Sequence, residues 1–294
     1  MTEKQINDAL IEMQENFDKK APAFRRAAKQ ALALARIRVV DIIAKYEKNG
    51  KVPKNRMNAM LTELTAVENA LYRDLLSQTT IIIEDSAEEA SEGLNAVLIG
   101  AIGVTALLVL RDGDEDSDAF KAAGFLLAIG MGLLALIKGV LDTVLGRRGD
   151  DGLNLRDRLR RLANDIIADV RKSLRKSIQT SEEISDIQRK VSQIFGTEEW
   201  RVDRITDTEA SVAYRTAIAR AAERSDLVAG LKIIDFPHGH PGVHETHKCY
   251  IYAQADDHGM GKGVYPVTTR KIRNPHPQCR SRLVVVMKEG VLDA

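Results

Sequence analysis

Two long uncharged stretches constrain the fold of this chain more than any other feature. Residues 94–110 and residues 122–137 contain no charged side chain, and an acidic segment at residues 112–118 separates them. A helix that is apolar on every face must be buried in protein or lipid. We therefore predict an apolar helical hairpin over residues 94–146.

Protein is the favoured surrounding of this hairpin. The helix of residues 94–110 would reach about 25 Å, less than the roughly 30 Å of a bilayer core. Neither stretch is flanked by Trp or Tyr, which mark membrane interfaces. We expect the hairpin in a bundle or oligomer core. Insertion into a membrane, stable or conditional on release, is the alternative, and its lipid-facing residues would be Leu98, Ile102, Leu107, Leu127, Leu133 and Leu136.

Helical patterns also dominate the sequence on either side of the hairpin. In residues 1–93, apolar side chains recur every three to four residues, as Ile6 and Leu10 illustrate. Residues 153–196 show the same spacing, with a basic face opposite the apolar one, and residues 180–183 (Thr-Ser-Glu-Glu) resemble a capping box. We predict a helical bundle or oligomerisation region at 1–93 and amphipathic helices at 153–196.

Residues 197–294 have a different character. The helical pattern ends by Gly230, Gly, Pro and His are then frequent, and residues 283–286 are typical of a closing strand. We predict a small, loop-rich α+β module here. The expected fold class is mainly α, with a long helical N-terminal region, an apolar helical hairpin and this C-terminal module.

Charge and cysteine content exclude some classes of protein. The formal net charge is +1, which provides no general attraction to nucleic acid. Two cysteines cannot form a disulfide scaffold, and the polar first residues do not resemble a secretory signal. We expect a protein that is made in a reducing cytoplasm.

All six histidines and both cysteines lie within residues 238–279. Two close pairs, His247 with Cys249 and His276 with Cys279, provide the ligand set of a closed tetrahedral zinc site. The alternative is that the cysteines pack as small buried residues while the histidines form hydrogen bonds in loops.

Other uses of this window depend on neighbouring residues. His244 could replace His247 as a ligand, because the two lie three residues apart. A metal-assisted hydrolase would need an open metal position and a base such as Glu245 or Asp257. No catalytic constellation is visible in the sequence, so we predict that the chain is not an enzyme.

Four motifs of the last third occur in a recognisable order: residues 180–195, residues 204–210, residues 245–249 and residues 276–282. This order resembles the head-morphogenesis family of tailed phages, the phage Mu F-like minor head proteins. The resemblance covers about residues 180–288. Its signature positions are Arg204, Thr208, Glu209, Ala210, His276, Pro277, Cys279, Arg280 and Arg282.

The resemblance implies a component of the virion. Proteins of this family are minor head proteins that associate with the portal or the capsid interior, and some enter the host with the DNA. It implies contact with the portal protein or the major capsid protein, and location in the capsid interior or at the portal vertex. The amphipathic N-terminal helices favour a homo-oligomer.

A basic run accompanies the last motif. Between residues 261 and 288 there are no acidic residues, and the basic ones include Lys262, Arg270, Lys271 and Arg273. These four residues could contact packaged DNA through its phosphates, or an acidic patch of the portal.

Three functions therefore follow as hypotheses. The first is a structural minor head protein. The second is a virion protein that leaves with the DNA and inserts its apolar hairpin into the host membrane. The third is a metal-assisted hydrolase or toxin-type enzyme that uses the His/Cys window.

Overall fold

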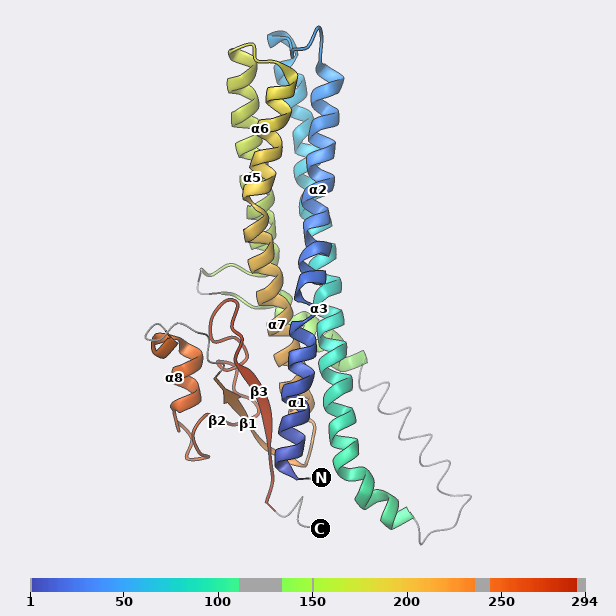
Figure 1. Ribbon diagram of the computed structural model, residues 1–294, viewed down its shortest axis with the longest axis vertical. Helices are drawn as coiled ribbons and strands as arrows, with labels where there is room; N and C mark the ends of the chain where they lie inside the picture. Colours follow the sequence, from blue (N-terminus) through green and yellow to red (C-terminus); the bar gives the residue numbers. More distant parts are fainter. Residues whose placement is uncertain (1, 111–133, 150, 236–243, 290–294) are drawn as a thin grey trace. The chain divides into compact units, whose positions relative to one another are not determined.

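Helices carry most of the chain, and one small antiparallel sheet is formed by residues of its C-terminal part (Figure 1). The computed structural model describes residues 2–110, 134–149, 151–235 and 244–289. The mainly α fold class with a C-terminal α+β module is confirmed. The chain divides into a helical unit, residues 22–82 and 145–207, and a mixed unit, residues 1–21, 83–144 and 208–294.

The helical unit is built from amphipathic helices that bury their apolar faces. It contains α2 (Ala21–Tyr46), the first part of α3 (Met57–Leu110), α5 (Leu155–Gln179), α6 (Ile184–Thr197) and the start of α7 (Glu199–Glu223). Ala28, Leu32 and Ala35 of α2 are at most 3% exposed, and Leu159 and Ile166 of α5 are at most 1% exposed. Their spacing of three to four residues places them on one side of each helix.

Local signals set the ends of these helices. α2 is followed by a turn in which Asn49 and Gly50 have φ angles of 56° and 79°, a conformation that Asn and Gly tolerate best. A short 3₁₀ helix, η1 (Lys54–Arg56), then leads into α3. Asn154 caps α5 through a capping box with Asp157, which satisfies amide groups at the helix start.

The capping box predicted at residues 180–183 is not formed. α6 begins at Ile184 after Glu183, and no side chain caps its first amides. The hydroxyl of Thr180 instead donates to the carbonyl oxygens of Lys176 and Ser177 at the end of α5. Thr180 therefore stabilises the end of α5 and not the start of α6, because its hydroxyl is hydrogen-bonded to carbonyl oxygens of the preceding helix.

The sheet lies in the mixed unit and has the order β2-β1-β3. The central strand β1 (Val228–Ile234) pairs antiparallel with β2 (Val264–Tyr265) and with β3 (Arg282–Met287). Strand β3 contains the closing strand that the sequence predicts. The short helices η2 (His244–Thr246) and α8 (Lys248–Gln254) connect β1 to β2, and α8 packs on β1.

Helix α1 (Glu3–Asp18) packs against β3 within the mixed unit (Figure 1). The Gln14 side chain donates to the Ser281 carbonyl oxygen at 3.2 Å and accepts from the Leu283 amide at 3.3 Å. The rings of Phe17 and Tyr214 stack at 4.4 Å. The first helix therefore supports the last strand, although the two lie at opposite ends of the sequence.

The predicted apolar hairpin falls mostly outside the described residues. The side chains of Leu98, Ile102 and Leu107 lie outside them, as do residues Leu127 and Leu133. Leu136 is 3% exposed, in a helix that spans residues 134–146. Among the described residues, no helix combines the length and the apolar character needed to cross a bilayer.

Candidate metal centre

The start of α8 and the loop before β3 bring two histidine and two cysteine side chains close together. His247 is the N-cap residue of α8, and Cys249 lies in the first turn of that helix. His276 and Cys279 come from the loop that leads into β3. Because α8 packs on β1 and β3 pairs with β1, the sheet carries both segments.

Three of the four predicted ligands form a group that could hold a metal ion. The ligand atoms of His247, Cys249 and His276 all lie within 4.8 Å of one another. The Nε2 atom of His276 is 3.1 Å from the Cys249 Sγ atom, and the two imidazole rings are 5.0 Å apart between centroids. His247 is exposed, Cys249 is buried and His276 is half-buried, so the group lies at the edge of the module.

The fourth predicted ligand, Cys279, adjoins this group. Its thiol shares hydrogen bonds with Cys249 and His276, and its Sγ atom is 3.1 Å from the Ser281 hydroxyl oxygen. The residue is 3% exposed, and no disulfide joins the two cysteines. Two imidazoles and two thiols thus converge from segments about 30 residues apart in the chain.

The hydrogen bonds of His276 fix which ring nitrogen is available to a metal. Its Nδ1 atom is 2.9 Å from the Pro277 carbonyl oxygen, which can only accept. Nδ1 therefore carries a proton, which leaves Nε2, 3.1 Å from the Cys249 Sγ atom, as the ring nitrogen that could bind a metal. A backbone acceptor on one nitrogen is the usual way in which proteins orient a histidine ligand.

Electrostatics make Cys279 the thiol that ionises first. Its pKa lies well below the ordinary 9.0, mainly because Cys249 donates a hydrogen bond to it, and the positive charge of Arg215 acts in the same direction. The pKa of Cys249 is raised because it donates to Cys279 and because it is buried. The pKa of His276 is raised above 6.5, mainly by its hydrogen bond with Cys279. These directions favour the thiolate form of Cys279, and the thiolate is the form of cysteine that binds metal ions.

A buried arginine holds the ligand loop in place. Arg215 of α7 is 1% exposed, and its Nη2 atom donates to the carbonyl oxygens of Cys279 and Ser281 at 2.6 and 2.8 Å. Among the described residues, its Nε and Nη1 atoms have no hydrogen-bond partner. The positive charge of this guanidinium lowers the pKa of the Cys279 thiol.

Two further contacts shape the loop. Gln278 has a left-handed φ of 55°, and its amide donates to the Thr208 hydroxyl of α7 at 3.2 Å. The left-handed residue turns the chain between His276 and Cys279, so both side chains can reach one centre. Thr208 is 6% exposed and therefore forms part of the wall against which the loop packs.

The signature positions divide into buried and exposed ones. Glu209 and Ala210 are at most 3% exposed, and Arg282 is 5% exposed and pairs with Asp18 of α1 at 2.5 Å. Arg204, Pro277 and Arg280 are exposed. The Arg282–Asp18 pair thus joins β3 to α1.

The predicted basic contact residues differ in their surroundings. Lys262 and Arg270 are exposed. Lys271 pairs with Asp257 at 2.5 Å and lies over the rings of Tyr252 and Tyr265. Arg273 is 8% exposed and pairs with Glu223 at 2.5 Å. Within the described part of the chain, Lys262 and Arg270 are therefore the two of these four residues that can meet a partner without first breaking an ion pair.

The roles of Arg215 and Gln14 were not predicted from the sequence. Both act on backbone atoms of the ligand loop, more than 60 residues away in the chain. The one available signal was an arginine within residues 212–219, a run of α7 that is otherwise rich in alanine and other apolar residues. The side chain of His244 lies outside the described residues, so its use in place of His247 stays a prediction.

Comparison with known proteins adds no relative. No family model, no curated protein and no solved structure matches this chain. The likeness to the phage head-morphogenesis family therefore stays a prediction from the four sequence motifs.

Proposed function

We propose that this chain is a minor head protein of a tailed bacteriophage, with a structural role and a C-terminal module held in shape by zinc. The observation that carries the proposal is the convergence of the motif residues. The Thr208 hydroxyl of residues 204–210 accepts a hydrogen bond from the Gln278 amide of residues 276–282, and His247 and Cys249 of residues 245–249 lie close to His276 of that last motif.

Zinc is the metal that best suits the donor set. Zn–N and Zn–S bonds of about 2.0–2.3 Å imply ligand atoms about 3.3–3.8 Å apart in a tetrahedron. The His247, Cys249 and His276 ligand atoms, within 4.8 Å of one another, need only small side-chain adjustments to reach that spacing. Cys279 would supply the second thiolate and complete the site.

The role of such an ion is structural. Four protein ligands leave no open position for a substrate or a water molecule, so the closed site favours stabilisation. The module around it has only a three-stranded sheet, one strand of which has two residues. A metal ion that ties α8 to the loop before β3 would stabilise a sheet of this size.

Metal analysis tests the zinc site. We expect one zinc ion per purified chain, and its loss in Cys249→Ser and in Cys279→Ser. His258→Asn is the matched control, because His258 contacts the Tyr265 ring in the same unit but lies outside the metal group. A wild-type chain that stays free of zinc in zinc-supplemented medium would contradict the site, and so would full zinc content in both serine variants.

Quantitative mass spectrometry of purified phage particles tests the minor head role separately. We expect the chain in full heads at a low copy number. Its retention in heads that have released their DNA would identify a portal or capsid component. Its absence from emptied heads would identify an ejected protein and support the membrane alternative. Absence from both kinds of particle would refute the phage role and leave the zinc site untouched.

The portal and capsid partners follow from the same proposal. Lys262 and Arg270 are the exposed cations with which the module would meet an acidic portal surface or packaged DNA. Replacing both with Glu should weaken binding to a portal ring or to duplex DNA, whichever is the partner, while zinc content stays unchanged.

A further inference from the structure

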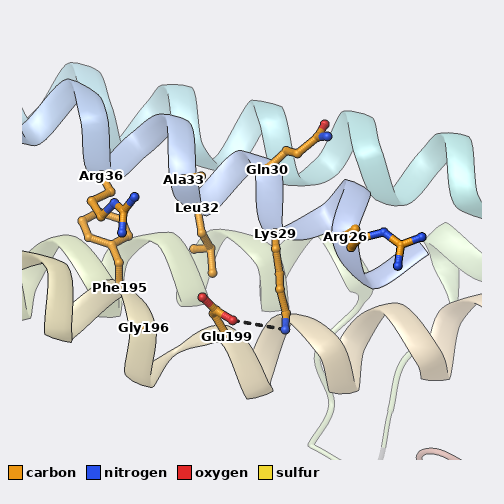
Figure 2. A pocket seen from close by; sticks show the side chains of 9 residues that line it. All are labelled: Arg26, Lys29, Gln30, Leu32, Ala33, Arg36, Phe195, Gly196 and Glu199. Carbon is orange, nitrogen blue, oxygen red and sulfur yellow. Dashed lines mark ion pairs between the residues drawn. The ribbon is translucent and has the colours of Figure 1, made fainter. Parts of the chain in front are cut away.

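A surface groove of the helical unit places two exposed arginines beside an apolar floor. The groove has a volume of about 290 Å³ and is lined by α2, the end of α6 and the first residue of α7 (Figure 2). Leu32 and Phe195 line it and are each 3% exposed. Arg26 and Arg36 lie toward opposite ends of the groove, and both side chains are exposed.

The groove carries a net positive charge. Lys29, near its middle, is already compensated by Glu199 at 3.1 Å and by Asp203 at 2.9 Å. Within the part of the chain that the structure describes, neither Arg26 nor Arg36 forms an ion pair. The two arginines are ten residues apart on one helix, hence about 15 Å along its axis. The groove therefore fits an anionic, elongated partner.

Helix α3 provides a surface of the opposite charge. Four acidic residues, which we call the α3 acidic face, are exposed and form no ion pair among the described residues: Glu84, Asp85, Glu88 and Glu92. Their spacing of three and four residues places them on one side of the helix. Like charges this close repel one another unless a cation compensates them.

We infer that the groove binds the α3 acidic face of a second copy of this chain, with the two helices antiparallel. The exposed apolar residues decide the direction. Ile37 follows Arg26 by eleven residues and is 50% exposed, and Ile81 precedes Glu92 by eleven residues and is 46% exposed. Eleven residues are about three helical turns, so each pair lies on one face of its helix.

The antiparallel arrangement satisfies both kinds of surface. When Arg26 lies beside Glu92, Ile37 lies beside Ile81, and Arg36 is within reach of the acidic pair at residues 84 and 85. A parallel arrangement would instead put Arg26 beside Ile81 and Ile37 beside Glu92. Pairing of opposite charges at one end and of apolar side chains at the other fixes register and orientation.

This contact is small and depends on charge. About three turns of helix bury much less than the roughly 1,200 Å² of a stable interface. The association should therefore be weak, concentration-dependent and sensitive to salt, since ions screen exposed charges beyond about 10 Å at 0.1 M. It depends on neither the metal site nor the phage role.

Sedimentation velocity of the full-length chain, at rising concentration and at low and high salt, tests this inference. We expect association at low salt and its loss at high salt. Arg26→Glu/Arg36→Glu and Glu84→Arg/Glu92→Arg should each weaken it by at least about tenfold. The chain that carries all four changes should associate again, because its charges are exchanged and remain complementary.

A matched control separates this contact from a general effect of charge. Arg161→Glu/Arg175→Glu makes the same change of charge on exposed positions of α5 and should leave association intact. Trp200, the single tryptophan, is 59% exposed and directly follows Glu199 of the groove, so its emission should shift to shorter wavelength on association. A chain that stays monomeric throughout, or a four-change chain that fails to associate while its helical circular dichroism is unchanged, would overturn the inference.

Discussion

The guanidinium of Arg215 donates a 2.6 Å hydrogen bond to the carbonyl oxygen of Cys279 from a position that is 1% exposed. A second bond reaches the Ser281 carbonyl oxygen at 2.8 Å, so one buried side chain fixes the backbone on both sides of Arg280. A charge buried this deeply is retained only when its partners compensate for its lost hydration. Arg215 therefore holds the loop before β3 in place, and the carbonyl oxygens of that loop in turn compensate the buried charge of Arg215.

Replacement of Arg215 by Met should lower the free energy of unfolding by about 3 kcal/mol, because two buried carbonyl oxygens lose their donor. It should also weaken zinc binding, since the carbonyl of Cys279 would no longer be held. Urea unfolding and competition with a chelator measure the two effects. Arg161→Met, on the surface of α5, is the control and should change neither quantity. Unchanged zinc affinity in a folded Arg215→Met chain would show that the loop is positioned by other contacts.

The response of the module to pH should reverse when zinc is bound. In the metal-free chain, the pKa of His276 is raised above 6.5 by its hydrogen bond with Cys279. Folding then favours the protonated ring. The resulting stability is fully present below pH 6.5 and is lost as the pH rises through the raised pKa. With zinc, the ion and the proton compete for Nε2, so acidification should destabilise the module, starting above pH 6.5.

Melting temperatures of the metal-free and the zinc-loaded chain across this pH range provide the measurement. His276→Asn should reduce the difference in slope, because Asn does not titrate, while His247 and the two cysteines still exchange protons for the ion. Parallel pH profiles for the two forms would mean that His276 does not bind the metal.

Local chemistry made part of this structure predictable, and long-range contacts made the rest unpredictable. The apolar spacing of α2 and α5 predicts their buried faces because a helix repeats every 3.6 residues. The three residues of the candidate metal group could be named from the sequence because thiols and imidazoles are rare and cluster in one window. Strand β1 was not predicted, since its seven residues contain Gly230 and form a strand only when β2 and β3 pair with it.

Arg215 and the position of α1 show the same limit. Sequence spacing alone argues against a buried arginine, because burial of a charge costs free energy. Hydrogen bonds to the carbonyl oxygens of a distant loop offset that cost. Helix α1 has an ordinary amphipathic sequence, and its contact with β3 depends on Gln14 meeting Ser281 and Leu283. Spacing along the chain carries no information about such partners.

The left-handed backbone of Gln278 leads to a paired prediction. A residue without a Cβ atom adopts a φ of 55° without strain, so Gln278→Gly should leave stability and zinc binding nearly unchanged. A β-branched residue is disfavoured there, and Gln278→Val should cost about 1–2 kcal/mol and weaken zinc binding. Thermal unfolding and chelator competition distinguish the two variants. Equal behaviour of Gly and Val would show that the loop can adopt another turn.

Gly263 connects the turn before β2 to both α8 and β1. Its φ is 72°, and a Cβ atom there would lie 2.8 Å from the Ala253 carbonyl oxygen and 2.9 Å from that of Ile233. Because neither backbone oxygen can move without shifting α8 or β1, Gly263→Ala should cost about 2–3 kcal/mol. It should also disturb Cys249 on α8 and so reduce zinc binding. The matched control is Gly196→Ala in α6, where a Cβ atom meets nothing within 4 Å and alanine should add about 0.5–1 kcal/mol. Denaturant unfolding of both variants decides the matter, since a Gly263→Ala chain as stable as wild type would mean that α8 does not pack on β1 as described.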